Sequence, residues 1–187
     1  ITLGVNLADN VMIGAYSEIA MSGVSAVNQI QFVFQQLMMG VGDGIVVLGS
    51  QYWGKRRPDA IRKFLPGAFL VGAGISLFLF VAACVAPEAI LAIFTPDPAI
   101  RAAGVEYLRI IKYSYLIFAL SQILLAMLRS VETVRIGFWV SLAALAVNIS
   151  LNYLLIGGHL GAPALGATGA AIATAAARTM ELAGVLI

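Results

Sequence analysis

The chain has little charge, one cysteine and one histidine, and each scarcity excludes a class of protein. Only 11% of its 187 residues are Asp, Glu, Lys or Arg, whereas 61% are hydrophobic, and the mean hydropathy is +0.97. A soluble core of this size could not bury so much apolar side chain, so the composition predicts a membrane protein. The net charge of +2 arises from residues at the ends of apolar runs, which argues against a nucleic-acid partner.

The same scarcity limits the chemistry. Cys84 is the only cysteine and lies in an apolar run, so it provides no disulfide framework or metal cluster within the chain, and we expect it to be an inert packing residue. An intramembrane prenyl transferase would need clustered aspartates to hold magnesium and diphosphate, but Asp9 and Asp43 lie on separate segments. We therefore expect neither an enzyme nor a cofactor.

Six apolar stretches of about membrane-spanning length alternate with polar or Gly/Pro-rich joints. They cover residues 1–16, 29–52, 65–87, 114–128, 136–156 and 166–187. This pattern predicts an all-α integral membrane protein with six transmembrane helices. The first stretch is shorter than the roughly 20 residues that span a bilayer, and the chain begins at Ile1 rather than Met, so we expect a fragment.

Basic residues are concentrated between the second and third stretches, in the joint over residues 54–63. They are Lys55, Arg56, Arg57, Arg62 and Lys63. The positive-inside rule places this joint in the cytoplasm, and alternation then places Arg129 and Arg135 inside as well. On the outer side, residues 96–112 alternate charged and apolar side chains at helical spacing. This predicts an amphipathic helix at the interface, where Tyr107, Tyr113 and Tyr115 would also lie.

Asp9 is an ionisable residue in an otherwise apolar stretch, residues 5–16. A carboxylate at the centre of a membrane helix costs about 2.5 kcal/mol or more, so chains rarely keep one there without a use for it. Counting from the outer helix ends at about 1.5 Å per residue places Asp9, Asn152 and Thr174 at a common depth of roughly 10–12 Å, with Asn148 one turn deeper.

These four side chains supply oxygen atoms that could hold a proton or a small hard cation such as sodium. The alternative for Asn148, Asn152 and Thr174 is that they only join helices by hydrogen bonds. A second membrane carboxylate, Asp43, lies within the glycine-rich residues 40–44. A nucleotide-binding loop would need a preceding strand and a nearby lysine, so we instead expect Asp43, together with Gln35, to line a cavity.

The last stretch combines small residues with one charge pair. Residues 166, 170 and 174, and likewise 169, 173 and 177, are Gly, Ala or Thr at four-residue spacing, which favours close helix packing. Arg178 and Glu181 are three residues apart, so we expect them to pair along one face of the helix.

Several segments together resemble the multidrug and toxic compound extrusion (MATE) family of cation-coupled antiporters. They are the sequences SQYWGK at 50–55, LRS at 128–130 leading to Arg135, NISLNYLLI at 148–156 and GATGAAIAT at 166–174. The resemblance covers essentially the whole chain. It implies that residues 1–187 form the amino-terminal six-helix lobe of a twelve-helix, two-lobe transporter, with the first helix truncated and the carboxy-terminal lobe absent.

The resemblance also implies a function. The protein would export organic, cationic or amphipathic compounds in exchange for protons or sodium, as a multi-pass protein of the plasma membrane, in bacteria the inner membrane. Its partners would be the small-molecule substrate, membrane lipid and the second lobe. Asp9 matches the first-helix aspartate of the family's amino-lobe cation site, and Asn148 and Thr174 match polar members of that site. Asn152 departs from the pattern, because some members carry an aspartate there.

Two other functions compete with this interpretation. A flippase for lipid-linked oligosaccharides belongs to the same superfamily but would need many basic residues in its cavity, and Arg178 is the one that we expect to be buried. A purely structural membrane subunit would leave Asp9 unexplained.

The orientation can be tested with the variants Asp59→Cys and Ala162→Cys in a Cys84→Ser background. We expect an impermeant thiol reagent added to intact cells to label position 162 and not position 59, because five basic residues hold the 54–63 joint in the cytoplasm. Labelling of position 59 but not of position 162 would reverse the topology.

Overall fold

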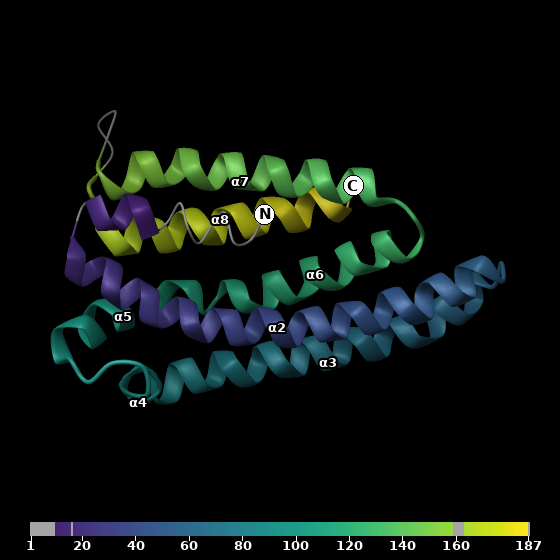
Figure 1. Ribbon diagram of the computed structural model, residues 1–187, viewed down its shortest axis with the longest axis horizontal. Coiled ribbons are helices and arrows are strands. Elements are labelled where there is room, and N and C mark those ends of the chain that lie inside the picture. Colours follow the sequence, from purple (N-terminus) through teal and green to yellow (C-terminus); the bar gives the residue numbers. More distant parts are fainter. Residues whose placement is uncertain (1–9, 16, 159–162, 187) are drawn as a thin grey trace.

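The computed structural model describes residues 10–15, 17–158 and 163–186, and these residues are α-helical apart from short joints. After a helical segment over residues 10–15, the helices are α2 Glu18–Gly54, α3 Pro58–Val85, α4 Pro87–Ala92, α5 Pro98–Ile111, α6 Ser114–Ser130, α7 Val134–Ile156 and α8 Gly166–Leu186. No strand occurs in the described ranges, which confirms the all-α class. Figure 1 shows α2, α3, α6, α7 and α8 running roughly along one axis, with α4 and α5 at one end.

Length and composition alone mark α2, α3 and α7 as helices able to cross a membrane, and the bent pair α5 and α6 as a fourth candidate with a 58° bend. The shorter α6 and the less apolar α8 run beside them (Figure 1). Large apolar side chains on α3, such as Leu70 at 76% and Phe78 at 73% exposure, face outward. This exposure suits a surface that contacts lipid or another part of a membrane assembly. The first predicted stretch, residues 1–16, lies mostly outside the described residues.

Two helices begin earlier than the apolar runs predict. α2 starts at Glu18 rather than near Gln29, because Ser17 caps it by accepting a hydrogen bond from the Ala20 amide at 3.3 Å. α3 starts at Pro58 rather than Leu65, because proline is well suited to the first turn of a helix. The polar joint therefore shrinks to residues 55–57, where Arg56 has a positive φ of 54°.

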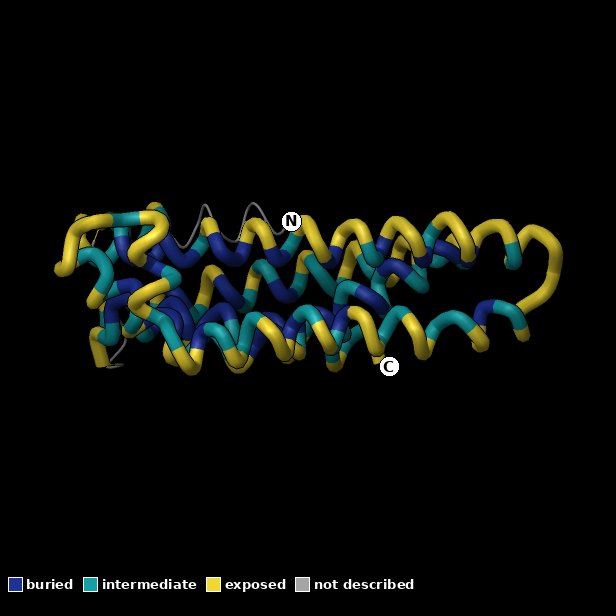
Figure 2. Tube along the Cα trace, turned by 90° about the horizontal axis from the view of Figure 1, so that it is seen from below, coloured by how far each residue is buried: buried dark blue, intermediate teal, exposed yellow. Residues whose placement is uncertain are grey.

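The joints alternate between the two ends of the bundle as the sequence predicts. The α2–α3 and α6–α7 joints, both basic in sequence, lie at the same end, opposite to α4 and α5 (Figure 1). Figure 2 shows that buried positions are denser toward the α4–α5 end, whereas the far ends of α2 and α3 are mostly exposed or partly exposed. The packed core thus lies nearer to the end that the sequence analysis places outside.

α2 and α5 cross at a pair of glycines. A Cβ atom added to Gly23 would lie 2.7 Å from the Gly104 amide nitrogen and 2.9 Å from the Ile100 carbonyl oxygen. The missing side chains therefore let the two backbones touch, which seats α5 against the bundle. The predicted amphipathic helix over residues 96–112 is confirmed as α5, but one of its faces packs into the core.

The aromatic residues of this region divide between core and surface. Tyr107 and Tyr115 are 0% and 1% exposed, so both rings are packed inside the protein, and their depth in a membrane stays a prediction. Tyr113 is 64% exposed, as expected for that position. The Phe34 ring of α2 packs on Tyr115 at 5.3 Å and on Phe118 at 5.5 Å between ring centroids. The contact with Phe34 helps to bury Tyr115, which follows the bend between α5 and α6.

The glycine crossing gives a stability prediction. Gly23→Ala should lower the free energy of unfolding by about 1–3 kcal/mol, because the new methyl group meets backbone atoms that cannot move aside. Gly40→Ala in the same helix is the matched control, since nothing lies within 4 Å of its added Cβ atom. Thermal melting in detergent would measure both variants, and equal melting temperatures would contradict the close crossing.

Candidate functional site

Asn148, Asn152 and Thr174 form a buried hydrogen-bonded cluster between α7 and α8. The Asn152 side-chain amide donates to Asn148 Oδ1 at 3.2 Å, and the Asn148 amide donates to Thr174 Oγ1 at 3.2 Å. Both asparagines are 0% exposed and Thr174 is 4% exposed. Asn152 and Thr174, predicted to share one level, are therefore connected through Asn148, predicted to lie one turn deeper.

The depth of Asn152 below the helix end differs from the sequence estimate. That estimate takes the outer end of the helix to be near His159, but α7 ends at Ile156 and His159 lies outside the described residues. Asn152 is therefore only four residues, about 6 Å, from the helix end. Asn148, predicted to lie one turn deeper, is the residue whose amide reaches Thr174.

Close packing of α7 and α8 brings these side chains together. A Cβ atom added to Gly169 would lie 2.6 Å from the Leu155 carbonyl oxygen, so only glycine allows this approach. The same carbonyl accepts a hydrogen bond from the Leu165 amide at 2.8 Å, which fixes the start of α8 against α7. Ala170, Ala173 and Ala177 are all buried, and the small-residue faces predicted for this helix are confirmed.

Asp9 lies outside the described residues, so its position relative to this cluster stays a prediction. The next residue, Asn10, belongs to the first described helical segment and contacts α2. Its Oδ1 accepts hydrogen bonds from Ser25 Oγ at 3.3 Å and from the Asn28 amide at 3.4 Å. The start of the described chain is thus joined to α2 by polar side chains.

Arg178 lies one helical turn beyond Thr174 on α8 and is 8% exposed. Its Nη1 donates to Ser114 Oγ of α6 at 2.6 Å and its Nη2 donates to Gln31 Oε1 of α2 at 2.5 Å. The guanidinium also lies 4.9 Å from the centre of the Phe118 ring, within the range of a cation–π contact. One buried cation on α8 therefore contacts two other helices, α2 and α6, one turn from the asparagine–threonine cluster.

Glu181 has a different neighbour from the one expected. It accepts a hydrogen bond from Ser141 Oγ of α7 at 2.6 Å, whereas Arg178 reaches toward α2 and α6. The two charged side chains thus extend toward different helices instead of lying along one face of α8. Each contributes a polar contact between α8 and a neighbouring helix.

Asp43 and Gln35 occupy different environments on α2. Asp43 is exposed, and the helix runs through residues 40–44 without a break. Of the glycines there, Gly42 is the one in close contact, since its added Cβ atom would lie 3.4 Å from both Ala126 Cβ and an Arg129 nitrogen. Gln35 is partly buried, and its Nε2 has no hydrogen-bond partner in the described part of the chain.

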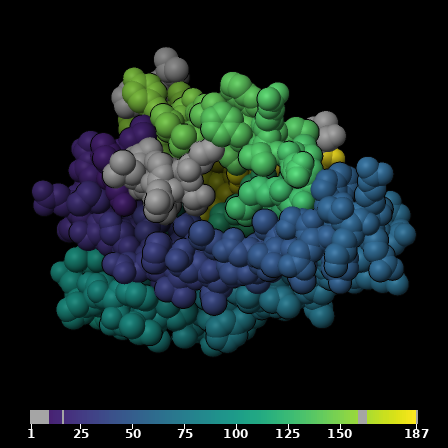
Figure 3. Space-filling model, turned by 45° about the vertical axis from the view of Figure 1, so that its right-hand side comes forward, coloured from purple at the N-terminus to yellow at the C-terminus, as the bar shows by residue number. Residues whose placement is uncertain are grey.

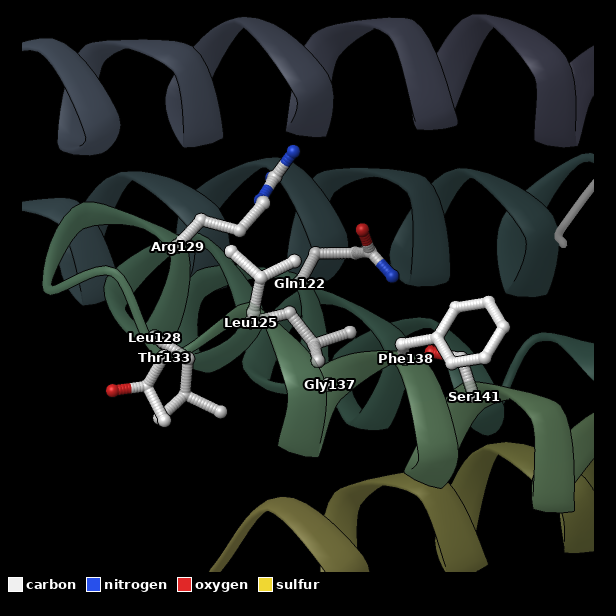
Figure 4. Close-up of a pocket in the computed structure, with 9 residues that line it drawn as sticks. Gln122, Leu125, Leu128, Arg129, Thr133, Gly137, Phe138 and Ser141 are labelled. Carbon is white, nitrogen blue, oxygen red and sulfur yellow. The ribbon is translucent and has the colours of Figure 1, made fainter.

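A cavity of about 270 Å³ lies between α6 and α7, near the end that holds the basic joints. Its polar lining comes from Gln122, Arg129, Thr133 and Ser141, and its apolar walls include Leu125 and Phe138. Figure 4 shows Arg129 extending away from the Thr133 side, and an Arg129 nitrogen lies close to Gly42 of α2. In Figure 3 the surface is hollowed between α2 and α7, with α8 visible in the depression.

The described residues supply neutral oxygen ligands rather than a metal cluster. No group of three or more His, Cys, Asp or Glu side chains that could hold a metal ion occurs within residues 10–15, 17–158 and 163–186. The oxygens of Asn148, Asn152 and Thr174 are hard donors that suit sodium, but a compensating carboxylate must come from outside the cluster.

Comparison with known proteins identifies the family. The MatE family model matches residues 1–154. The chain belongs to the MatE family. It is 29% identical over 181 residues to a probable multidrug resistance protein NorM of Thermotoga maritima and 27% identical over 173 residues to one of Geobacillus kaustophilus, covering 96% and 91% of this chain.

The solved structures agree with the fold. A crystal structure of MATE in the bent conformation superposes with a TM-score of 0.88 at 15% identity, covering 97% of this chain and 40% of that one. The chain also spans only 39% and 37% of the length of the two NorM relatives. This MatE chain is therefore a helical membrane lobe similar to part of a larger transporter.

Sequence reasoning missed the polar face of α2 in this MatE chain. Ser25, Asn28 and Gln31 lie three residues apart. Ser25 and Asn28 donate to Asn10 Oδ1, and Gln31 donates to Asn28 Oδ1. The regular spacing is a readable signal, because residues at i, i+3 and i+6 share one side of a helix. Hydropathy does not detect it, because Ser25 and Asn28 fall in the joint between the stretches 1–16 and 29–52 and Gln31 falls at the start of the second stretch.

The cluster gives a second stability prediction. Thr174→Val keeps the shape of the side chain but removes the acceptor of the Asn148 amide, so it should cost about 1–3 kcal/mol of folding free energy. Thr179→Val is the control, because Thr179 is exposed and bonds only to the Ala175 carbonyl of its own helix. Thermal melting of both variants should show a loss for Thr174→Val alone.

Proposed function

We propose that this chain is the amino-terminal lobe of a proton- or sodium-coupled antiporter that exports organic, cationic or amphipathic compounds across the plasma membrane. The printed names of its relatives, multidrug resistance proteins, support export of drug-like compounds as the activity of the whole protein. The coupling ion would bind at Asp9 together with Asn148, Asn152 and Thr174. The transporter has no catalytic step and needs the second lobe to complete its substrate path.

The contact between Asn148, Asn152 and Thr174 is the observation that supports this proposal most. Three polar side chains, all nearly inaccessible, meet between two helices in the packed half of the lobe. Polar groups in a membrane interior are costly unless they are satisfied, and ionisable ones there are commonly functional. A carboxylate added to this cluster by Asp9 would complete a site for one monovalent cation.

The mechanism follows from the charge of that site. An ionised Asp9 in a low-dielectric interior is unfavourable, and a bound proton or sodium ion removes the charge. A ligand shifts a conformational equilibrium only by the difference between its affinities for the two states. Cation entry from outside would therefore favour the conformation that releases the organic substrate outward, and substrate entry from inside would reset it.

The flippase alternative has less support. A diphosphate-linked sugar carries several negative charges and needs a cavity with several cations. Among the described residues Arg178 is the buried basic side chain, and it already bonds to Ser114 and Gln31. The buried polar side chains that the structure describes therefore suit a small cation better than a polyanionic lipid.

The central test is Asp9→Asn in the complete protein, reconstituted in vesicles with proton and sodium gradients imposed separately. Asparagine keeps the shape and hydrogen bonding of aspartic acid but cannot exchange a proton. We therefore expect a folded protein that binds substrate but whose gradient-driven efflux falls at least tenfold. A tenfold change corresponds to one pKa unit of interaction energy, which is a small effect for the loss of a charged group. Efflux at the parent rate with unchanged ion dependence would reduce Asp9 to a structural residue.

Two further variants give the matched controls. Asp43→Asn removes the other membrane carboxylate, on the exposed side of α2, and should leave the ion dependence unchanged. Asn152→Asp adds a second acid to the cluster and should strengthen the response to a sodium gradient.

A further inference from the structure

A chain of hydrogen bonds leads from Arg178 across α2 to the first described helical segment. Arg178 Nη2 donates to Gln31 Oε1, Gln31 Nε2 donates to Asn28 Oδ1 at 3.3 Å, and Asn28 Nδ2 donates to Asn10 Oδ1 at 3.4 Å. Every bond in this series runs in the same direction, from donor on the Arg178 side to acceptor on the Asn10 side. We call these four residues the polar relay.

The guanidinium explains why the relay has a single direction. Arginine carries five N–H donors and no acceptor, so Gln31 must turn its oxygen toward Arg178. The Gln31 amide then faces Asn28 as a donor, which in turn obliges Asn28 to present its oxygen to Gln31 and its amide to Asn10. Hydrogen bonds in such a series polarise one another. The orientation of the amides as far as Asn10 therefore depends on the charge at Arg178.

Arg178 is also next to the candidate cation site. It follows Thr174 by four residues, so the two lie on the same face of α8 about 6 Å apart along the axis. Long side chains of a helix lean toward its amino-terminal end, and this direction carries the Arg178 stem toward the turn that holds Thr174. Contacts with Ser114 and Phe118 hold the guanidinium in place.

We propose that Arg178 senses the cation bound at the Asn148–Asn152–Thr174 cluster and, through the polar relay, controls how the first helix is seated on α2. This inference rests on the proposed function, because it requires that the cluster binds a cation. A cation in the site repels the guanidinium and weakens its hold on Gln31. Gln31 and Asn28 can then reorient, and Asn10 loses a polarised donor.

The relay makes Arg178 a positioning residue, since it acts on the first helix only through Gln31 and Asn28. It also sets the affinity of the site. Like unit charges held on neighbouring helical turns, at an effective dielectric constant of about 20, repel by an energy equivalent to roughly tenfold or more in binding. Arg178→Met should therefore tighten binding of the coupling ion by at least about tenfold, whereas Arg178→Lys keeps the charge and should not.

The experiment uses the complete protein in nanodiscs, with Cys84→Ser and spin labels on Val11→Cys and Leu70→Cys, which are exposed positions outside the relay. Double electron–electron resonance measures the distance between the two spin labels. One titration adds sodium chloride, with choline chloride at equal ionic strength as its control. A second titration lowers the pH from 8 to 5. Ion binding is measured in parallel by calorimetry or proton uptake. In the parent we expect the coupling ion to shift the distance distribution.

The decisive variant is Gln31→Leu, which removes both the acceptor for Arg178 and the donor to Asn28. We expect it to bind the ion but to lose at least half of the ion-dependent change in distance. Gln36→Leu is the matched control, because Gln36 is exposed on the same helix, and it should keep the full change. Asn28→Leu, with exposed Gln29→Leu as its control, interrupts the relay at a second point and serves if Gln31→Leu does not fold.

The outcomes separate the relay from the site. Ion binding with an undiminished change in distance in both Gln31→Leu and Asn28→Leu would overturn the relay and leave the proposed function standing. A lower melting temperature alone would show that Gln31 is only structural. Absence of both sodium and proton binding in the parent would refute the proposed function and the relay together.

Discussion

The close approach of α7 and α8 is the constraint on which the candidate site depends. Gly169 lies against the Leu155 backbone at a distance that no larger residue would allow, and the alanines that follow it continue the contact. Helices in a membrane gain little from the hydrophobic effect when they associate, so short backbone distances and hydrogen bonds hold them together. Only at this separation can the short side chains of Asn148 and Thr174 meet.

Polar contacts between helices extend beyond this pair. Arg178 joins α8 to α2 and α6, Glu181 joins α8 to α7, and Asn10 joins the first helical segment to α2. Each group would be costly in an apolar interior without its partner. The lobe is thus held by a few directional bonds between helices whose outer faces are apolar. Directional bonds can be exchanged for others of similar energy, and this property would suit the conformational change proposed for the complete transporter.

The sequence predicted the features that depend on composition and on local pattern. Apolar run lengths predicted helices, charge placement predicted the alternation of joints, and four-residue spacing of small residues predicted close packing of the last helix. The helix starts at Glu18 and Pro58 were missed, because Ser17 and Pro58 determine them locally and hydropathy does not detect caps. The burial of Tyr107 was missed for another reason. Tyr107 lies on the face of α5 that packs into the core, and the sequence pattern does not show that this face meets other helices.

The polar contact between α7 and α8 was predictable in its members but not in its connections. Depth counting placed Asn152 and Thr174 at one level and Asn148 one turn deeper, and the structure joins all three by hydrogen bonds. Depth counting could not give the direction of the hydrogen bonds, because these depend on the surroundings of each amide.

Arg178, one turn from the cluster, gives a reason for asparagine rather than aspartate at position 152. With one buried guanidinium, one carboxylate at Asp9 would leave the region neutral before the ion binds and singly positive afterward. A second carboxylate at position 152 would make it singly negative and then neutral. If the proposed cation site is present, an asparagine at this position would favour release of the cation, which the proposed transport needs as much as binding.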